Sequence, residues 1–100
     1  MLLDEIIQYF NSILPLSEVE KTDASMNGLQ VTRSKSEIKK VAFAVDACMA
    51  VFERAAEAEA DLLCVHHGLW WGSPIPLTGT HYRRIKYLLD HDIALYAAHL

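Results

Sequence analysis

Apolar side chains near the start of the chain recur at steps of three and four residues, which is the period of an α-helix with one buried face. The repeating positions are Leu3, Ile6, Ile7, Phe10, Ile13 and Leu14. Asp4 and Glu5 favour the positive end of such a helix, and Pro15 closes it. The pattern therefore predicts an amphipathic helix over residues 3–14.

The next segment is polar and follows neither the helix nor the strand period. It spans residues 16–27, and we expect it to run over the surface. Asn27-Gly28 is typical of a chain break, and Leu29-Gln30-Val31 then predicts a short strand.

The second half of the chain alternates apolar runs with helical patterns. The uninterrupted apolar run Val41–Val45 is typical of a strand buried on both faces, and residues 49–60 predict a helix. The remaining predictions are strands over 62–65 and 93–98, a loop over 68–80, and a helix from Thr80 with the apolar face Tyr82, Ile85, Leu88 and Leu89. Strands that alternate with helices predict an α/β fold with a largely parallel sheet and flanking helices.

Composition fits one globular domain over residues 1–100. The chain has 100 residues, 52% of them hydrophobic, which is enough for one core. Its net charge of −4, with no dense Lys/Arg cluster, makes nucleic acid an unlikely partner. No apolar run approaches a membrane span and the start lacks a cationic leader, so we expect a cytoplasmic protein. Cys48 and Cys64 lie in apolar segments, which favours reduced thiols over a disulfide.

Four side chains that can bind or orient a metal follow the predicted strands. Asp46, His66, His67 and His99 each stand where a strand ends. Because the carboxyl ends of parallel strands meet at one edge of a sheet, these side chains are expected at the same place. Imidazole is the commonest metal ligand among side chains, so this edge is a candidate metal site.

The adjacent histidines leave two interpretations open. Neighbouring side chains of a strand point to opposite faces. His66 and His67 can therefore both take part in a metal site only if the strand has ended before them or if two ions are bound. The alternative is one buried structural histidine and one exposed histidine. Asp46 is either the N-terminal cap of the following helix or a residue that orients a ligand.

The other candidate residues have simpler interpretations. His81 and His91 are expected on the surface of the last helix. Trp70 and Trp71 fit core or subunit contacts, with stacking on a flat ring as the alternative. Cys64 is expected to pack rather than to bind metal.

Three segments carry a resemblance to a known family. Residues 27–31 read NGLQV, residues 61–72 read DLLCVHHGLWWG, and residues 92–100 read DIALYAAHL. In this order and spacing they resemble the N-terminal signatures of the NIF-three-like dinuclear metal-centre proteins, often labelled GTP cyclohydrolase I type 2. The resemblance implies the N-terminal portion of a NIF-three-like fold in a ring-shaped homo-hexamer.

The resemblance also implies two divalent metal ions per subunit. His66 and His67 match the family's two histidine ligands, one for each ion, and His99 matches a residue near the site that orients ligands. Zn, Fe, Mn, Ni and Co all suit imidazole and carboxylate ligands. The implied function is metal-dependent hydrolysis of a nucleotide-like substrate; the alternative is a non-catalytic hexameric protein that binds metal or serves as a scaffold.

The sequence departs from the family pattern at its end. It stops at Leu100, where family members continue with proline, leucine and a metal-binding aspartate, and it lacks the later histidine and glutamate. We therefore expect this chain to be the first part of a longer protein.

We predict that the 100 residues alone bind metal weakly, because two imidazoles leave most of a coordination shell to water. Elemental analysis after dialysis checks this, with substoichiometric metal as the expected result. Near-stoichiometric retention of two ions would contradict it.

Overall fold

The computed structural model describes residues 1–14, 26–71 and 73–99. Its elements in chain order are α1 (Leu3–Ile13), β1 (Gly28–Val31), β2 (Val41–Asp46), α3 (Met49–Glu57), β3 (Leu62–His67), α4 (Gly79–Asp90) and β4 (Ala94–Ala97). The strands form one sheet in the order β1-β4-β3-β2, with β2, β3 and β4 parallel and β1 antiparallel to β4. This confirms the predicted α/β fold with a largely parallel sheet. The expected surface segment 16–27 lies outside the described residues except for Met26 and Asn27.

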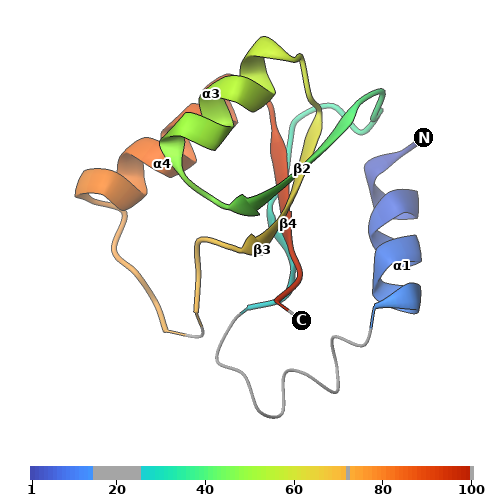
Figure 1. Cartoon of the computed structure of the whole chain (residues 1–100), viewed down its shortest axis with the longest axis horizontal. Helices are drawn as coiled ribbons and strands as arrows, with labels where there is room; N and C mark the ends of the chain where they lie inside the picture. Colours follow the sequence, from blue (N-terminus) through green and yellow to red (C-terminus); the bar gives the residue numbers. More distant parts are fainter. Residues whose placement is uncertain (15–25, 72, 100) are drawn as a thin grey trace.

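The sheet separates two apolar layers (Figure 1). Helices α3 and α4 cover one face and α1 lies on the other. Successive side chains of β3 alternate between them: Leu63 and Val65 pack with Phe52 of α3 and Leu88 of α4. Leu62 and Cys64 instead pack with the residues of α1. The continuous apolar run of β3 therefore reflects burial on both faces.

Helix α1 matches its prediction closely. Leu3 and Ile6 are buried, and the Glu5 carboxylate accepts a hydrogen bond of 2.9 Å from the Leu2 N–H at the helix start. Within the described ranges, none of the helices combines the length and the hydropathy that a membrane span requires.

The prediction that Val41–Val45 is buried on both faces is wrong. Strand β2 is at the edge of the sheet, where Phe43 and Val45 are 74% and 61% exposed. Helix α1 packs over β4 rather than over these side chains: the centroid of the Phe10 ring lies 5.2 Å from that of the Tyr96 ring. An apolar run reports strand formation, but it does not distinguish a central strand from an edge strand.

The predicted apolar face of α4 is half right: Leu88 is buried and Ile85 packs against the core, but Tyr82 and Leu89 do not. His81 and Leu88 are buried, whereas Tyr82 and Leu89 are 48% and 58% exposed. The expectation that His81 lies on the surface is therefore wrong: its ring packs edge-on against Trp70 at 5.0 Å. His91 is exposed, as predicted, and stacks on Tyr87.

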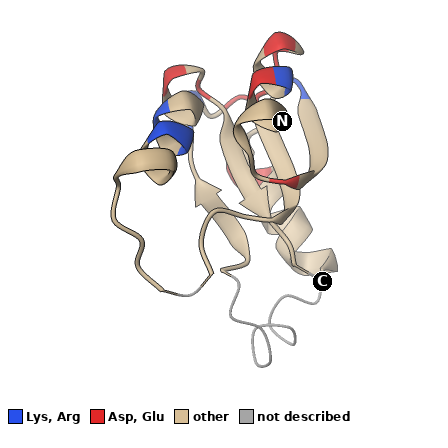
Figure 2. Ribbon diagram, turned by 60° about the vertical axis from the view of Figure 1, so that its left-hand side comes forward, with Lys and Arg blue, Asp and Glu red and all other residues tan. Residues whose placement is uncertain are grey.

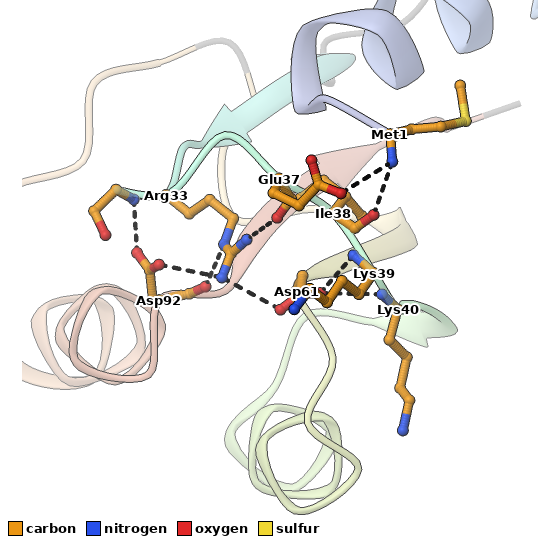
Figure 3. Close-up of polar contacts among 9 residues, drawn as sticks. Met1, Arg33, Glu37, Ile38, Lys39, Lys40, Asp61 and Asp92 are labelled. Atoms are coloured by element: carbon orange, nitrogen blue, oxygen red, sulfur yellow. Dashed lines mark hydrogen bonds and ion pairs between the residues drawn. The ribbon is translucent and has the colours of Figure 1, made fainter.

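One arginine joins the segments that precede the parallel strands (Figure 3). The Arg33 side chain is 7% exposed and lies 3.2 Å from a carboxylate oxygen of Asp61 and 3.2 Å from one of Asp92. Asp61 also accepts hydrogen bonds from the backbone N–H groups of Lys39 and Lys40. We call Arg33, Asp61 and Asp92 the arginine cluster. It ties together the chain immediately before β2, β3 and β4.

Both carboxylates of the cluster are stabilised in their charged form. Burial raises the pKa of Asp61, but hydrogen bonds from Lys39 and Lys40, together with the charge of Arg33, bring it below its ordinary value of 3.8. Burial also raises the pKa of Asp92, and the Ser34 hydrogen bonds and Arg33 likewise bring it below 3.8.

Substituting Arg33→Met is expected to lower the free energy of unfolding by about 1–3 kcal/mol, because the variant loses the hydrogen bonds to the Glu37 and Asp92 carbonyl oxygens and the ion pairs with both carboxylates. Urea unfolding at pH 7 measures the loss. The control is Lys86→Met, which removes an exposed pair with Asp90 and should change stability little.

The same cluster predicts a pH dependence. A carboxylate whose folded pKa is lowered stabilises the fold above its ordinary pKa, and this stability is lost as the pH falls through the folded pKa. Wild-type stability should therefore decline between about pH 5 and pH 2, and Arg33→Met should decline less. Parallel pH curves for the two proteins would contradict this role.

Candidate metal centre

The candidate site lies at the carboxyl ends of the three parallel strands. Asp46 is the last residue of β2, His66 and His67 are the last two of β3, and His99 follows β4 by two residues. Asp46 is paired in register with His67. Figure 2 shows most charged residues toward the opposite end of the sheet, so this edge is sparsely charged.

Three imidazoles converge at this edge. One ring nitrogen each of His66, His67 and His99 can be chosen so that all three lie within 4.8 Å of one another. The ring centroid of His66 lies 4.5 Å from those of both His67 and His99, and the His67 and His99 centroids are 5.3 Å apart. We call these residues the histidine cluster. Each is partly buried, which is the environment of a site that admits a ligand from solvent.

The strand does not end before the histidine pair, because β3 runs through His67. His66 lies on the face of Cys64 and His67 on the face of Val65, as alternation requires. The centroids of their rings nevertheless lie only 4.5 Å apart. The alternative of one packed and one solvated histidine does not describe this arrangement.

Each ring of the pair has a partner for Nδ1. The Nδ1 atom of His67 lies 2.8 Å from Oδ1 of Asp46, and the Nδ1 atom of His66 lies 3.3 Å from the Ala98 carbonyl oxygen. Carboxylate and carbonyl oxygens only accept, so both Nδ1 atoms donate, and in the neutral tautomer of either ring the lone pair is on Nε2. Metal-binding histidines typically have such an oriented second nitrogen.

Asp46 does not cap the following helix. The N-terminal cap of α3 is Cys48, two residues further on. The Asp46 carboxylate instead holds the His67 ring, 2.8 Å away.

The two tryptophans have different environments. Trp70 packs against the core and against His81. Trp71 is 40% exposed, and its ring lies 5.8 Å from His67 and 5.1 Å from His99. Trp71 therefore offers an accessible aromatic surface beside the histidine cluster, whereas Trp70 is a packing residue.

An apolar cavity reaches the cluster from the α1 side. Its volume is about 370 Å³, and His66 forms part of its wall together with residues of α1, β2 and β4. Burial raises the pKa of Cys64, which also lines it, to about 11. The Cys64 thiol is therefore protonated at neutral pH, and it packs in the buried cluster with residues of α1, which agrees with the prediction that it packs. Cys48 and Cys64 are both free cysteines.

Two amide side chains at the site were not predicted. The Asn27 Oδ1 atom accepts a hydrogen bond of 2.8 Å from the His99 N–H. The Gln30 Oε1 atom accepts one of 2.7 Å from the Leu69 N–H, two residues after the histidine pair. Their common signal in the sequence was the NGLQ motif, read there as a chain break and a strand.

Comparison with known proteins identifies relatives over the whole chain. A family model described as Duf34/NIF3 (NGG1p interacting factor 3) matches residues 1–100. A protein of Treponema pallidum named GTP cyclohydrolase 1 type 2 homolog is 53% identical over 96 residues, which are 96% of this chain and 34% of the relative. One of the same name from Archaeoglobus fulgidus is 47% identical over 100 residues, covering 100% of this chain and 40% of the relative.

Solved structures show the same fold. The crystal structure of TTHA1606 from Thermus thermophilus is 47% identical with a TM-score of 0.94, and the match covers 100% of this chain and 40% of that one. Reduced HcgD from Methanocaldococcus jannaschii is 31% identical with a TM-score of 0.81, covering 98% and 39%. The chain thus spans well under half the length of these relatives.

Gly68 is predicted to be indispensable to the geometry after the histidine pair. A Cβ atom at this position would lie 2.6 Å from Nε2 of Gln30 and 2.7 Å from Cβ of Ala97. Gly68→Ala should therefore lower the free energy of unfolding by about 1–3 kcal/mol, measured by thermal or urea unfolding. Ser73→Ala, an exposed position of the same loop, is the control. Equal stability of the two variants would contradict the close approach.

Proposed function

Because the chain belongs to the Duf34/NIF3 family, we propose that its histidine cluster forms part of a dinuclear divalent-metal centre that catalyses hydrolysis of a nucleotide-like substrate. The observation that carries the proposal is the convergence of His66, His67 and His99 within 4.8 Å. In this assignment His66 and His67 each hold one ion. His99 stands close enough to both rings to orient them or to add a third nitrogen.

The donor set fits such a group. Three partly buried imidazoles, two of them with Nδ1 engaged, present neutral nitrogen ligands of the kind that Zn, Fe, Mn, Ni and Co accept. Imidazoles that were only structural would not need one nitrogen of each ring to lie within 4.8 Å of the others. Carboxylate ligands from elsewhere in the complete protein would supply the remaining negative charge.

A bound dinuclear centre would lower the pKa of a coordinated water, so that hydroxide forms near neutral pH, and would act as a Lewis acid on an electrophilic carbon or phosphorus. The residues of this chain have separate tasks around it. Asp46 fixes the tautomer and the direction of His67, which makes the imidazole a stronger ligand. The exposed ring of Trp71 is suited to stack on a flat base beside the cluster.

The substrate class follows from the relatives, whose names refer to GTP cyclohydrolase. A second candidate is a non-catalytic metal-binding protein that assembles into a ring-shaped hexamer. The exposed side chains of Phe43 and Val45 on the edge strand β2 support assembly under either candidate, because large apolar groups in such a position are typical of a covered interface.

A double substitution, His66→Ala with His67→Ala, tests the proposal in the full-length protein. We expect the metal content after dialysis to fall by most of its wild-type value, because each ion loses its imidazole. Release of products from GTP and other nucleotides should fall to background. His91→Ala, an exposed histidine that follows α4 and lies outside the cluster, is the matched control.

The two candidates give different results. Metal binding and turnover that are lost together support the hydrolase. Metal binding that is lost in a protein whose wild type turns over no nucleotide supports the assembly protein. Metal content that is unchanged in the double variant contradicts both.

A further inference from the structure

The amide side chains of Asn27 and Gln30 lie beside the candidate metal centre without belonging to the histidine cluster. Asn27 immediately precedes β1, and Gln30 is the third residue of that strand. We call these two residues the amide pair. Because β1 is antiparallel to β4, the start of β1 lies beside the end of β4, at the same edge as the histidines.

Asn27 holds the chain after β4. Its Oδ1 atom accepts a hydrogen bond of 2.8 Å from the backbone N–H of His99, the residue that carries the third imidazole. The pairing of β1 with β4 ends at the pair Gly28 and Ala97, the first residue of β1 and the last residue of β4. His99 therefore lies beyond the paired residues. The Asn27 side chain therefore takes the place of a strand partner for the His99 backbone.

Gln30 holds the chain after β3. Its Oε1 atom accepts a hydrogen bond from the Leu69 N–H at 2.7 Å, and its Nε2 atom donates to the carbonyl oxygens of Met26 at 2.7 Å and Trp70 at 3.4 Å. One side chain thus fixes both residues that separate the histidine pair and Gly68 from Trp71. It also joins this loop to the residue that precedes Asn27.

Gly68 shows how closely Gln30 approaches the loop. The position where a Cβ of residue 68 would stand is occupied by the Gln30 amide on one side and by Ala97 on the other. The glycine of the HHG motif and the glutamine of the NGLQ motif therefore form one packed contact. A contact of this kind leaves the backbone after His67 little freedom to move.

We propose that Asn27 and Gln30 are positioning residues of the metal centre, which fix the backbone after β3 and β4 so that the three imidazoles converge. This inference rests on the proposed metal binding. Neither residue needs to touch an ion. Their contribution is to hold His99 and the loop after His67 in place before metal binds. Less of the binding free energy is then lost to ordering these segments.

The test uses Co²⁺ alone with the full-length protein. Asn27→Ala removes the hydrogen bond to the His99 backbone, and Gln30→Met removes those to the Leu69, Met26 and Trp70 backbone. Each is expected to weaken Co²⁺ binding about 10-fold or more, the usual effect of losing a partner that orients a ligand, and to change the visible absorption of bound Co²⁺. Competition with a chromogenic chelator gives the affinity, well below each variant's unfolding temperature.

Two controls separate positioning from general stability. Asn27→Asp keeps an acceptor oxygen for the His99 N–H and should bind Co²⁺ within about 3-fold of wild type. Gln8→Met makes the same replacement as Gln30→Met at an exposed position of α1 and should not alter affinity or spectrum.

The outcomes are distinguishable. Variants that lose stability but bind Co²⁺ with wild-type affinity and spectrum would overturn the positioning role while leaving the metal centre intact. Wild-type protein that binds no Co²⁺ would overturn the metal centre as well. Hydrogen exchange of the Leu69 and His99 amides gives a reading without metal: both should exchange faster, in Gln30→Met and Asn27→Ala respectively, and unchanged rates would also overturn the proposal.

Discussion

The parallel pairing of β2, β3 and β4 is the constraint on which the candidate site depends. Parallel strands place all their carboxyl ends at one edge, so residues 21 or more positions apart in the chain become neighbours, as Asp46 and His67 do. The connections through α3 and α4 keep these helices on one face of the sheet and leave the carboxyl ends of the strands uncovered by them. One or two polar side chains at the end of each strand are then enough to build a polar cluster outside both apolar layers.

Much of this arrangement could be predicted from the sequence because the signals are local. The period of α1, the apolar runs of β3 and β4, and the positions of His66 and His67 depend on neighbouring residues only. The exposure of Phe43 and the burial of His81 depend on what lies opposite them in the folded chain. Apolar content does not specify strand order, and a histidine fits a buried stripe or a surface equally well when a tryptophan is available to cover it.

The same distinction applies to the site. The histidine pair was a signal because two side chains that can bind metal stand with a glycine at the end of a buried strand, but the amide pair was not. Asparagine and glutamine bond to backbone groups in turns, caps and loops of every kind, so their types carry little information about where they act. The spacing of Asn27 and Gln30 acquires meaning only once β1 is known to run antiparallel beside β4.

The beginnings and the ends of the parallel strands carry different polar clusters. The arginine cluster and its backbone hydrogen bonds lie before the parallel strands, where Asp61 and Asp92 hold the segments in a fixed relation. At the opposite edge the histidine cluster has few fixed charges around it (Figure 2). Because the strands are anchored at their beginnings, their ends can carry partly buried, polar side chains that would weaken a less constrained sheet.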